Sequence, residues 1–179
     1  TGVAAGAGST LSLDFATASS EYVRTFSLPP GTARIVNGML TLTAADFEQT
    51  GSALVSIPTL DAMSEWAAEF DVYAGGGNGG EGVSFNVGAL PPTYFGENGV
   101  RSALSVQLHS TARRLDVWHA RALLAQSGEA VVLSRGRFSR VEVTYGDEGL
   151  SVRVDGERVV ENVTLSSWLP DPSWSVGIG

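Results

Sequence analysis

Residues 66–88 read WAAEFDVYAGGGNGGEGVSFNVG, and this stretch decides the fold. Its first eight residues alternate, with Trp66, Ala68, Phe70 and Val72 on one face and mostly polar residues on the other, which is the period of a half-buried strand. The alternation resumes in residues 83–87. We therefore predict two strands of one antiparallel sheet with a single apolar face, joined by a loop.

The segment between these two predicted strands is a first candidate for a binding site. Residues 75–82 contain six glycines in eight positions. Glycine allows positive φ and lets a backbone come close to a ligand or to another strand. The alternative is a long hairpin connection that binds nothing. A second candidate is the loop 89–101, which includes Tyr94, because connections of this length are often functional.

The composition indicates one globular domain. The chain has 179 residues, of which 43% are hydrophobic and 17% charged, and it contains 22 glycines. We expect a single β-sandwich domain over residues 1–179, with residues 1–9 flexible. The chain starts without methionine and ends directly after the strand-like WSVGIG, so we also expect it to be a piece of a larger protein.

Charge and residue usage exclude several functions. The net charge of -8 disfavours a nucleic-acid partner. No apolar run approaches the roughly 20 residues that span a bilayer, so membrane insertion is not expected. The chain has neither cysteine nor lysine, which excludes thiol nucleophiles, zinc-thiolate sites and Schiff-base chemistry.

The remainder of the chain repeats the strand-and-turn pattern. Asn37-Gly38 and Asp155-Gly156 lie between alternating segments and are strong two-residue hairpin signals. We count about a dozen strands with regularly spaced turns and no convincing helix, which predicts an all-β sandwich or barrel. His119 shares a face with Leu115 and Val117, so we interpret it as a core or edge histidine, in preference to a zinc ligand shared with His109.

The order of these segments resembles a known fold. The segments are EFDVYAGGGNGGEGVSFNVG at 69–88, FGENGVRSALSVQLHS at 95–110, GLSVRVDGERVVENVTL at 149–165 and the final WSVGIG. They are similar to the concanavalin A-like jelly roll of legume-type lectins, laminin G-like modules and laminarinase-type glucanases. The resemblance implies a two-sheet antiparallel sandwich.

Departures from that family limit what the resemblance implies. Legume-type lectins place an Asp-Gly pair before an aromatic strand, and Glu81-Gly82 stands there in this sequence. Their acidic metal-binding strand corresponds to residues 106–109, which read VQLH, so the lectin double-metal site is expected to be absent and no cofactor is predicted. Calcium in the glycine loop stays an alternative. The Glu-x-Asp-x-Glu strand of the glucanases has Tyr73 in its last position, so no enzyme activity is expected.

The predicted ligand contacts combine both loops with a polar sheet face. We predict that the strands containing Glu69, Asn86, Gln107 and Trp118 share one sheet and expose their polar sides. The alternative is an ordinary solvated sheet face. The predicted ligand-binding residues are Tyr73, Asn78, Glu81, Gly82, Asn86, Tyr94, Gln107 and Trp118.

Three functions follow from this site. The first is a non-catalytic carbohydrate-binding or adhesion module of an extracellular or cell-surface protein, with a glycan as partner. The second is a structural jelly-roll domain that contacts protein neighbours in a larger assembly. The third is a degenerate glycan hydrolase.

Overall fold

The structure is a computed structural model that describes residues 2–5, 9–12, 23–30, 32–44, 48–56, 64–75, 82–128, 133 and 136–179. These residues form β-strands, loops and one short 3-10 turn, η2 (Gly96–Asn98). No helix in this part of the chain has the length and hydropathy needed to cross a membrane.

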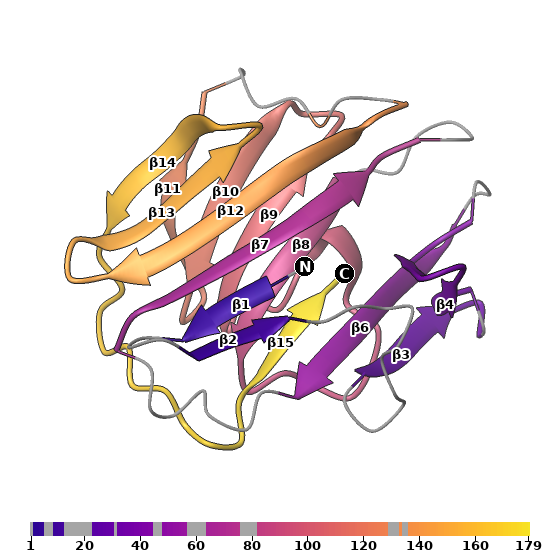
Figure 1. The fold of residues 1–179 in the computed structure, drawn as a ribbon, viewed down its shortest axis with the longest axis horizontal. Helices are drawn as coiled ribbons and strands as arrows, with labels where there is room; N and C mark the ends of the chain where they lie inside the picture. Colours follow the sequence, from indigo (N-terminus) through magenta and orange to yellow (C-terminus); the bar gives the residue numbers. More distant parts are fainter. Residues whose placement is uncertain are drawn as a thin grey trace.

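Two antiparallel sheets make up the body of the protein (Figure 1). The seven-stranded sheet has, in spatial order, β11 (Ala122–Gln126), β10 (Arg114–His119), β9 (Leu104–His109), β8 (Gly82–Gly88), β15 (Ser175–Ile178), β6 (Thr50–Ser56) and β3 (Val23–Leu28). The six-stranded sheet has β14 (Glu157–Val163), β13 (Gly149–Val154), β12 (Phe138–Gly146), β7 (Trp66–Tyr73), β1 (Gly2–Ala5) and β2 (Ser9–Ser12). A separate hairpin consists of β4 (Arg34–Val36) and β5 (Met39–Thr41).

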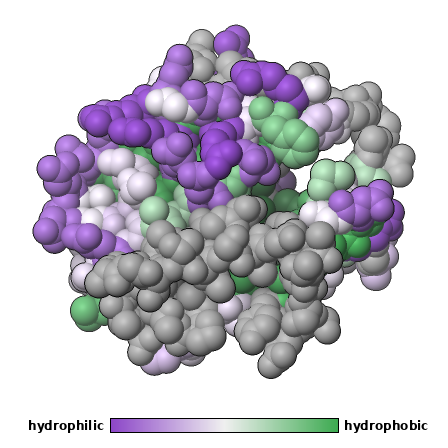
Figure 2. All heavy atoms as spheres, in the orientation of Figure 1, coloured by the Kyte–Doolittle hydropathy of each residue, from purple (hydrophilic) through white to green (hydrophobic). Residues whose placement is uncertain are grey.

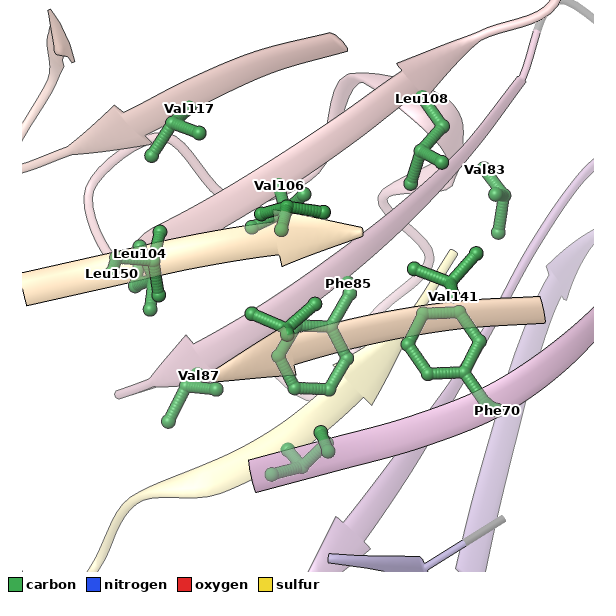
Figure 3. Close-up of a cluster of buried hydrophobic side chains, with 14 of the residues drawn as sticks. Phe70, Val83, Phe85, Val87, Leu104, Val106, Leu108, Val117, Val141 and Leu150 are labelled. Carbon is green, nitrogen blue, oxygen red and sulfur yellow. The ribbon is translucent and has the colours of Figure 1, made fainter. Parts of the chain in front are cut away.

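The core lies between the two sheets. Phe70 of β7 and Phe85 of β8 stack across it with ring centroids 5.5 Å apart and planes tilted by 19°. Aliphatic side chains from both sheets surround this pair, among them Val106 and Val141 (Figure 3). Each core strand contributes every second residue, which explains the alternation in the sequence.

The fold confirms the predicted all-β sandwich and both hairpin turns. Asn37 and Gly38 have φ of 49° and 74°, and Asp155 and Gly156 have φ of 51° and 83°. Two successive positive φ values are what a tight turn between right-twisted strands requires, and Asn, Asp and Gly adopt them most easily.

The predicted pairing of the strands on either side of the glycine segment is wrong. Strand β7 pairs with β12 and β1, whereas β8 pairs with β9 and β15. The apolar faces of β7 and β8 meet across the core and do not lie side by side in one sheet. Alternation identifies the buried face of a strand but not its hydrogen-bonded neighbour, and both arrangements bury the same residues.

The amino-terminal end also differs from the sequence expectation. Residues 2–5 form β1, which pairs with β7 in the six-stranded sheet, whereas the sequence predicted a flexible end. The segment GVAA has little alternation of its own. It forms a strand because its backbone pairs with that of β7.

Candidate functional site

The outer face of the seven-stranded sheet is polar and buried. Six polar residues on this face are fully or almost fully inaccessible: Ser52, Ser84, Asn86, Ser105, Gln107 and Asp116. They alternate with core residues along β6, β8, β9 and β10, so they point away from the sandwich interior. The loop from residue 89 to residue 103 covers part of this face. The covered part of the sheet is therefore not open to solvent.

Side chains of the sheet hold this loop through its backbone. Ser84 Oγ donates to the Gly96 carbonyl oxygen at 2.6 Å, and the Val100 amide donates to Asn86 Oδ1 at 2.8 Å. Gln107 Nε2 donates to the carbonyl oxygen of Asn98. Buried backbone groups need such partners, so these side chains fix the height and position of residues 96–100 over β8 and β9.

Asn86 and Gln107 differ in what they leave for a ligand. Asn86 Nδ2 donates to Ser84 Oγ at 3.0 Å and to the Gly177 carbonyl at 3.4 Å, so both ends of its amide have partners. Gln107 Oε1 is buried and has no hydrogen-bond partner among the described residues. A buried acceptor without a partner is rare in folded proteins and needs an explanation.

Next to Gln107 lies a group of charged and polar side chains. Asp116 is the cross-strand partner of Gln107, and its carboxylate lies 3.2 Å from Arg114 Nε and accepts a hydrogen bond from Gln126 Nε2 at 2.9 Å. His109 Nε2 lies 3.3 Å from Asp116 Oδ2, but without the angles of a hydrogen bond, so it too is a buried polar atom without one. We call Gln107, His109 and Asp116 the β9–β10 cluster.

An aromatic residue stands at the other end of β10. The guanidinium of Arg101 lies 4.2 Å from the ring centroid of Trp118, a cation–π contact, and Trp118 Nε1 is buried without a partner in the described part of the chain. Tyr94, on the same loop as Arg101, is 42% exposed. Sequence reasoning missed Arg101, and the only signal for it was its place in a long loop.

Not all predicted site residues lie near this loop. Tyr73 lies on β7, in the other sheet, so the prediction that four strands share one polar face is wrong. Gly82 begins β8, where a Cβ atom would stand 2.1 Å from the Leu108 carbonyl oxygen, so only glycine fits there. Asn78 and Glu81 lie outside the described residues.

The part of the chain that the structure describes shows no metal-binding group. Calcium takes six to eight oxygen ligands, several of them carboxylates. The described residues contain no group of three or more histidine, aspartate or glutamate side chains that could hold an ion. The carboxylate of Asp116 already faces Arg114 and His109.

The two histidines lie on opposite faces of the seven-stranded sheet. His109 belongs to the β9–β10 cluster, whereas His119 packs against Trp168 with ring centroids 5.8 Å apart. Burial lowers the pKa of His119 below its ordinary value. This arrangement agrees with the sequence interpretation of His119 as a core or edge residue.

Comparison with solved structures shows the same fold in lectin domains. The exoplasmic/lumenal domain of VIP36, in its Ca²⁺/Man-bound form, matches with a TM-score of 0.67 and 13% identity over 88% of this chain and 75% of that one. The carbohydrate recognition domain of Emp46p, in its potassium-bound form, matches with a TM-score of 0.65 and 12% identity over 93% of this chain and 86% of that one. The chain therefore has the predicted concanavalin A-like jelly-roll fold.

A more distant match is the carbohydrate-binding module CBM66 from Bacillus subtilis. Its TM-score is 0.50, with 11% identity over 72% of this chain and 71% of that one. No family model and no curated protein matches the sequence.

Proposed function

We propose that this jelly roll is a non-catalytic carbohydrate-binding module that binds a glycan beside the loop on the outer face of its seven-stranded sheet. The observation that carries the proposal is the exposed aromatic side chain of Tyr94, on the loop that covers the β9–β10 cluster. Asn98 on this loop and Gln126 beside Asp116 are exposed, and their amide groups can donate to and accept from sugar hydroxyls. The VIP36 domain is described in a Man-bound form, and the Emp46p domain is described as a carbohydrate recognition domain. The fold that this chain shares with both domains supports the same class of ligand.

The proposed site has a polar part and an aromatic part. The β9–β10 cluster supplies hydrogen-bonding groups, and Asn98 of η2 lies directly beside it through its contact with Gln107. Tyr94 and the face of Trp118 that Arg101 leaves uncovered supply flat surfaces on which a sugar ring can stack. Asn78, Glu81 and Gly82, which precede or begin β8, complete the proposed set of contacts, and Asn86 contributes by holding the loop.

The charges on β7 support binding without hydrolysis. Glu69 and Asp71 both contact the guanidinium of Arg140, which holds them as ion-paired carboxylates on an exposed face. A retaining glycosidase needs a second carboxylic acid that can donate a proton, and Tyr73 stands in the place where the resemblance would put it. We propose an extracellular or cell-surface location, which agrees with the exoplasmic or lumenal origin of the VIP36 domain.

The test compares glycan binding by the wild type with binding by two variants in the aromatic part of the site, which we call the rim variants. We expect Tyr94→Ala and Trp118→Ala each to weaken binding on a glycan array, confirmed by calorimetry, by about tenfold, the loss of one stacking contact. Leu169→Ala is the matched control, because Leu169 is exposed and lies on another loop. Unchanged binding by both rim variants would place the glycan elsewhere, and a wild type that binds no glycan would refute the proposed function.

A second candidate function is a structural domain that contacts protein neighbours. Four large apolar side chains are exposed on β3 and the β4–β5 hairpin: Leu28, Ile35, Val36 and Met39. Exposed apolar groups beside an edge strand are typical of protein contacts. If this function is the main one, Met39→Glu will abolish association with the neighbour and leave glycan binding unchanged, as measured by light scattering and calorimetry.

A further inference from the structure

We propose a second glycan-binding site on the outer face of the six-stranded sheet, built on Tyr73 of β7 and Phe138 of β12. This inference rests on the proposed function for its class of ligand, an uncharged sugar. It uses a different sheet and different residues, so it can fail or hold separately. Figure 2 looks onto this face, where hydrophilic residues predominate over the described upper part and a group of hydrophobic atoms lies among them.

Tyr73 and Phe138 form an exposed aromatic pair. They are cross-strand partners, their ring centroids lie 5.3 Å apart with planes tilted by 53°, and they are 54% and 52% exposed. The Tyr73 ring lies over Gly75, where a Cβ atom would stand 2.6 Å from it. The backbone thus supports one side of the ring and leaves the remainder open to a ligand.

Strand geometry places Phe138 outside the core. Val141 and Val143 on β12 are buried in the core, and side chains alternate along a strand, so Phe138 faces outward with Arg140. A half-exposed phenylalanine side chain forgoes part of the stabilisation that full burial would give. The pair is therefore available for contact and is not part of the packed interior.

The charges around the pair favour a neutral ligand. Arg140 contacts Glu69 and lies 3.5 Å from Asp71, while Arg137 lies 3.1 Å from Asp155. Each of these charges already has a partner of opposite sign, so a charged ligand would have to displace one. The same carboxylates retain free lone pairs that can accept from hydroxyl groups.

A pyranose ring fits these features better than a protein segment. One face of a sugar ring carries C–H groups that stack on an aromatic ring, and its edge carries hydroxyl groups that reach the flanking carboxylates. A stable protein interface covers about 800 Å² on each partner and has an apolar centre. Here two aromatic rings are bordered directly by ion pairs, which gives the size and polarity of a sugar subsite.

The two sites would lie on opposite faces of the sandwich. The seven-stranded sheet carries the site beside Trp118, and the six-stranded sheet carries the Tyr73–Phe138 pair. One chain could then bind two separate glycans, so a monomer would cross-link polymers that carry many copies of the same sugar.

The test is an NMR titration with uncharged disaccharides, namely mannobiose, cellobiose, laminaribiose and lactose. We expect at least one of them to shift the ring resonances of Tyr73 and Phe138 in the wild type and equally in Trp118→Ala. Phe138→Leu and Tyr73→Ala should weaken this binding about tenfold, as expected for the loss of one stacking contact. Tyr73→Phe should retain it, because the ring stays in place.

Met39→Ala is the control for the loss of an exposed apolar side chain on a distant hairpin. If the disaccharides shift only resonances around Trp118, the second site is refuted and the proposed function stands. If they shift only the Tyr73 and Phe138 rings, the second site stands and the first is misplaced. If none of them shifts any resonance, both proposals are refuted.

Discussion

Gly99 lies directly above Ser105: a Cβ atom on Gly99 would stand 2.1 Å from the Ser105 hydroxyl oxygen and 2.6 Å from Asn86 Oδ1. Gly99 also has a φ of 57°, which other residues adopt at a cost. The loop over the seven-stranded sheet therefore depends on glycine at its point of closest approach. The depth of this loop sets how much of the β9–β10 cluster a ligand can reach.

We expect Gly99→Ala to lift the loop from the sheet, because the clash and the positive φ act together. The free energy of unfolding should fall by about 1–3 kcal/mol, the usual cost of a strained backbone position, and glycan binding beside the loop should be lost. Urea unfolding and calorimetry measure the two effects. Gly128→Ala is the matched control, since a Cβ there meets nothing within 4 Å, and an equal loss in both variants would contradict this account.

Asn86→Ala should destabilise the protein by about 1–3 kcal/mol, because it leaves the buried Val100 amide without its acceptor. The Val100 amide should also exchange its hydrogen faster than in the wild type. Ser151→Ala, which removes the acceptor of an exposed amide, is the control. A fall in stability of less than about 0.5 kcal/mol, within the range of ordinary surface substitutions, would show that the loop does not depend on Asn86.

The sequence identified the faces of the strands but not what covers them. Alternation in β8 and β9 correctly directed Asn86 and Gln107 away from the core, yet both are buried because a distant loop lies over them. That cover depends on a tertiary contact for which the strand pattern has no signal. The same limit explains the wrong prediction that β7 pairs with β8, since either arrangement buries Phe70 and Phe85 against each other.

The alternation along β12 predicts the outward position of Phe138. Phe138 lies an odd number of residues from Val141 and Val143, so its side chain must face the other side of the sheet. A strict count along β12 would have placed an exposed aromatic residue on the outer sheet face. Its pairing with Tyr73 depends on the register between β12 and β7, which only the structure supplies.

Phe85→Ala should lower the free energy of unfolding by about 3–5 kcal/mol, because Phe85 is buried at the centre of the core and stacks on Phe70. Chemical denaturation measures this loss. Phe95→Ala is the matched control, because Phe95 is only partly buried and lies on the loop. A loss at Phe85 no greater than the loss at Phe95 would contradict the position of the core.

Stability should fall between neutral and mildly acidic pH because of His119. Burial lowers the pKa of this side chain below its ordinary value of 6.5. The unfolded chain therefore takes up the proton first, so the stabilisation is complete above pH 6.5 and is lost as the pH falls from there towards the lower pKa of the folded state. We expect His119→Gln to flatten the dependence of thermal stability on pH between about 7.5 and 5.5, the range in which histidine titrates, and calorimetric scans measure it. His109→Gln is the control for the other histidine, and a His119→Gln variant that keeps the full wild-type pH dependence would show that His119 does not cause it.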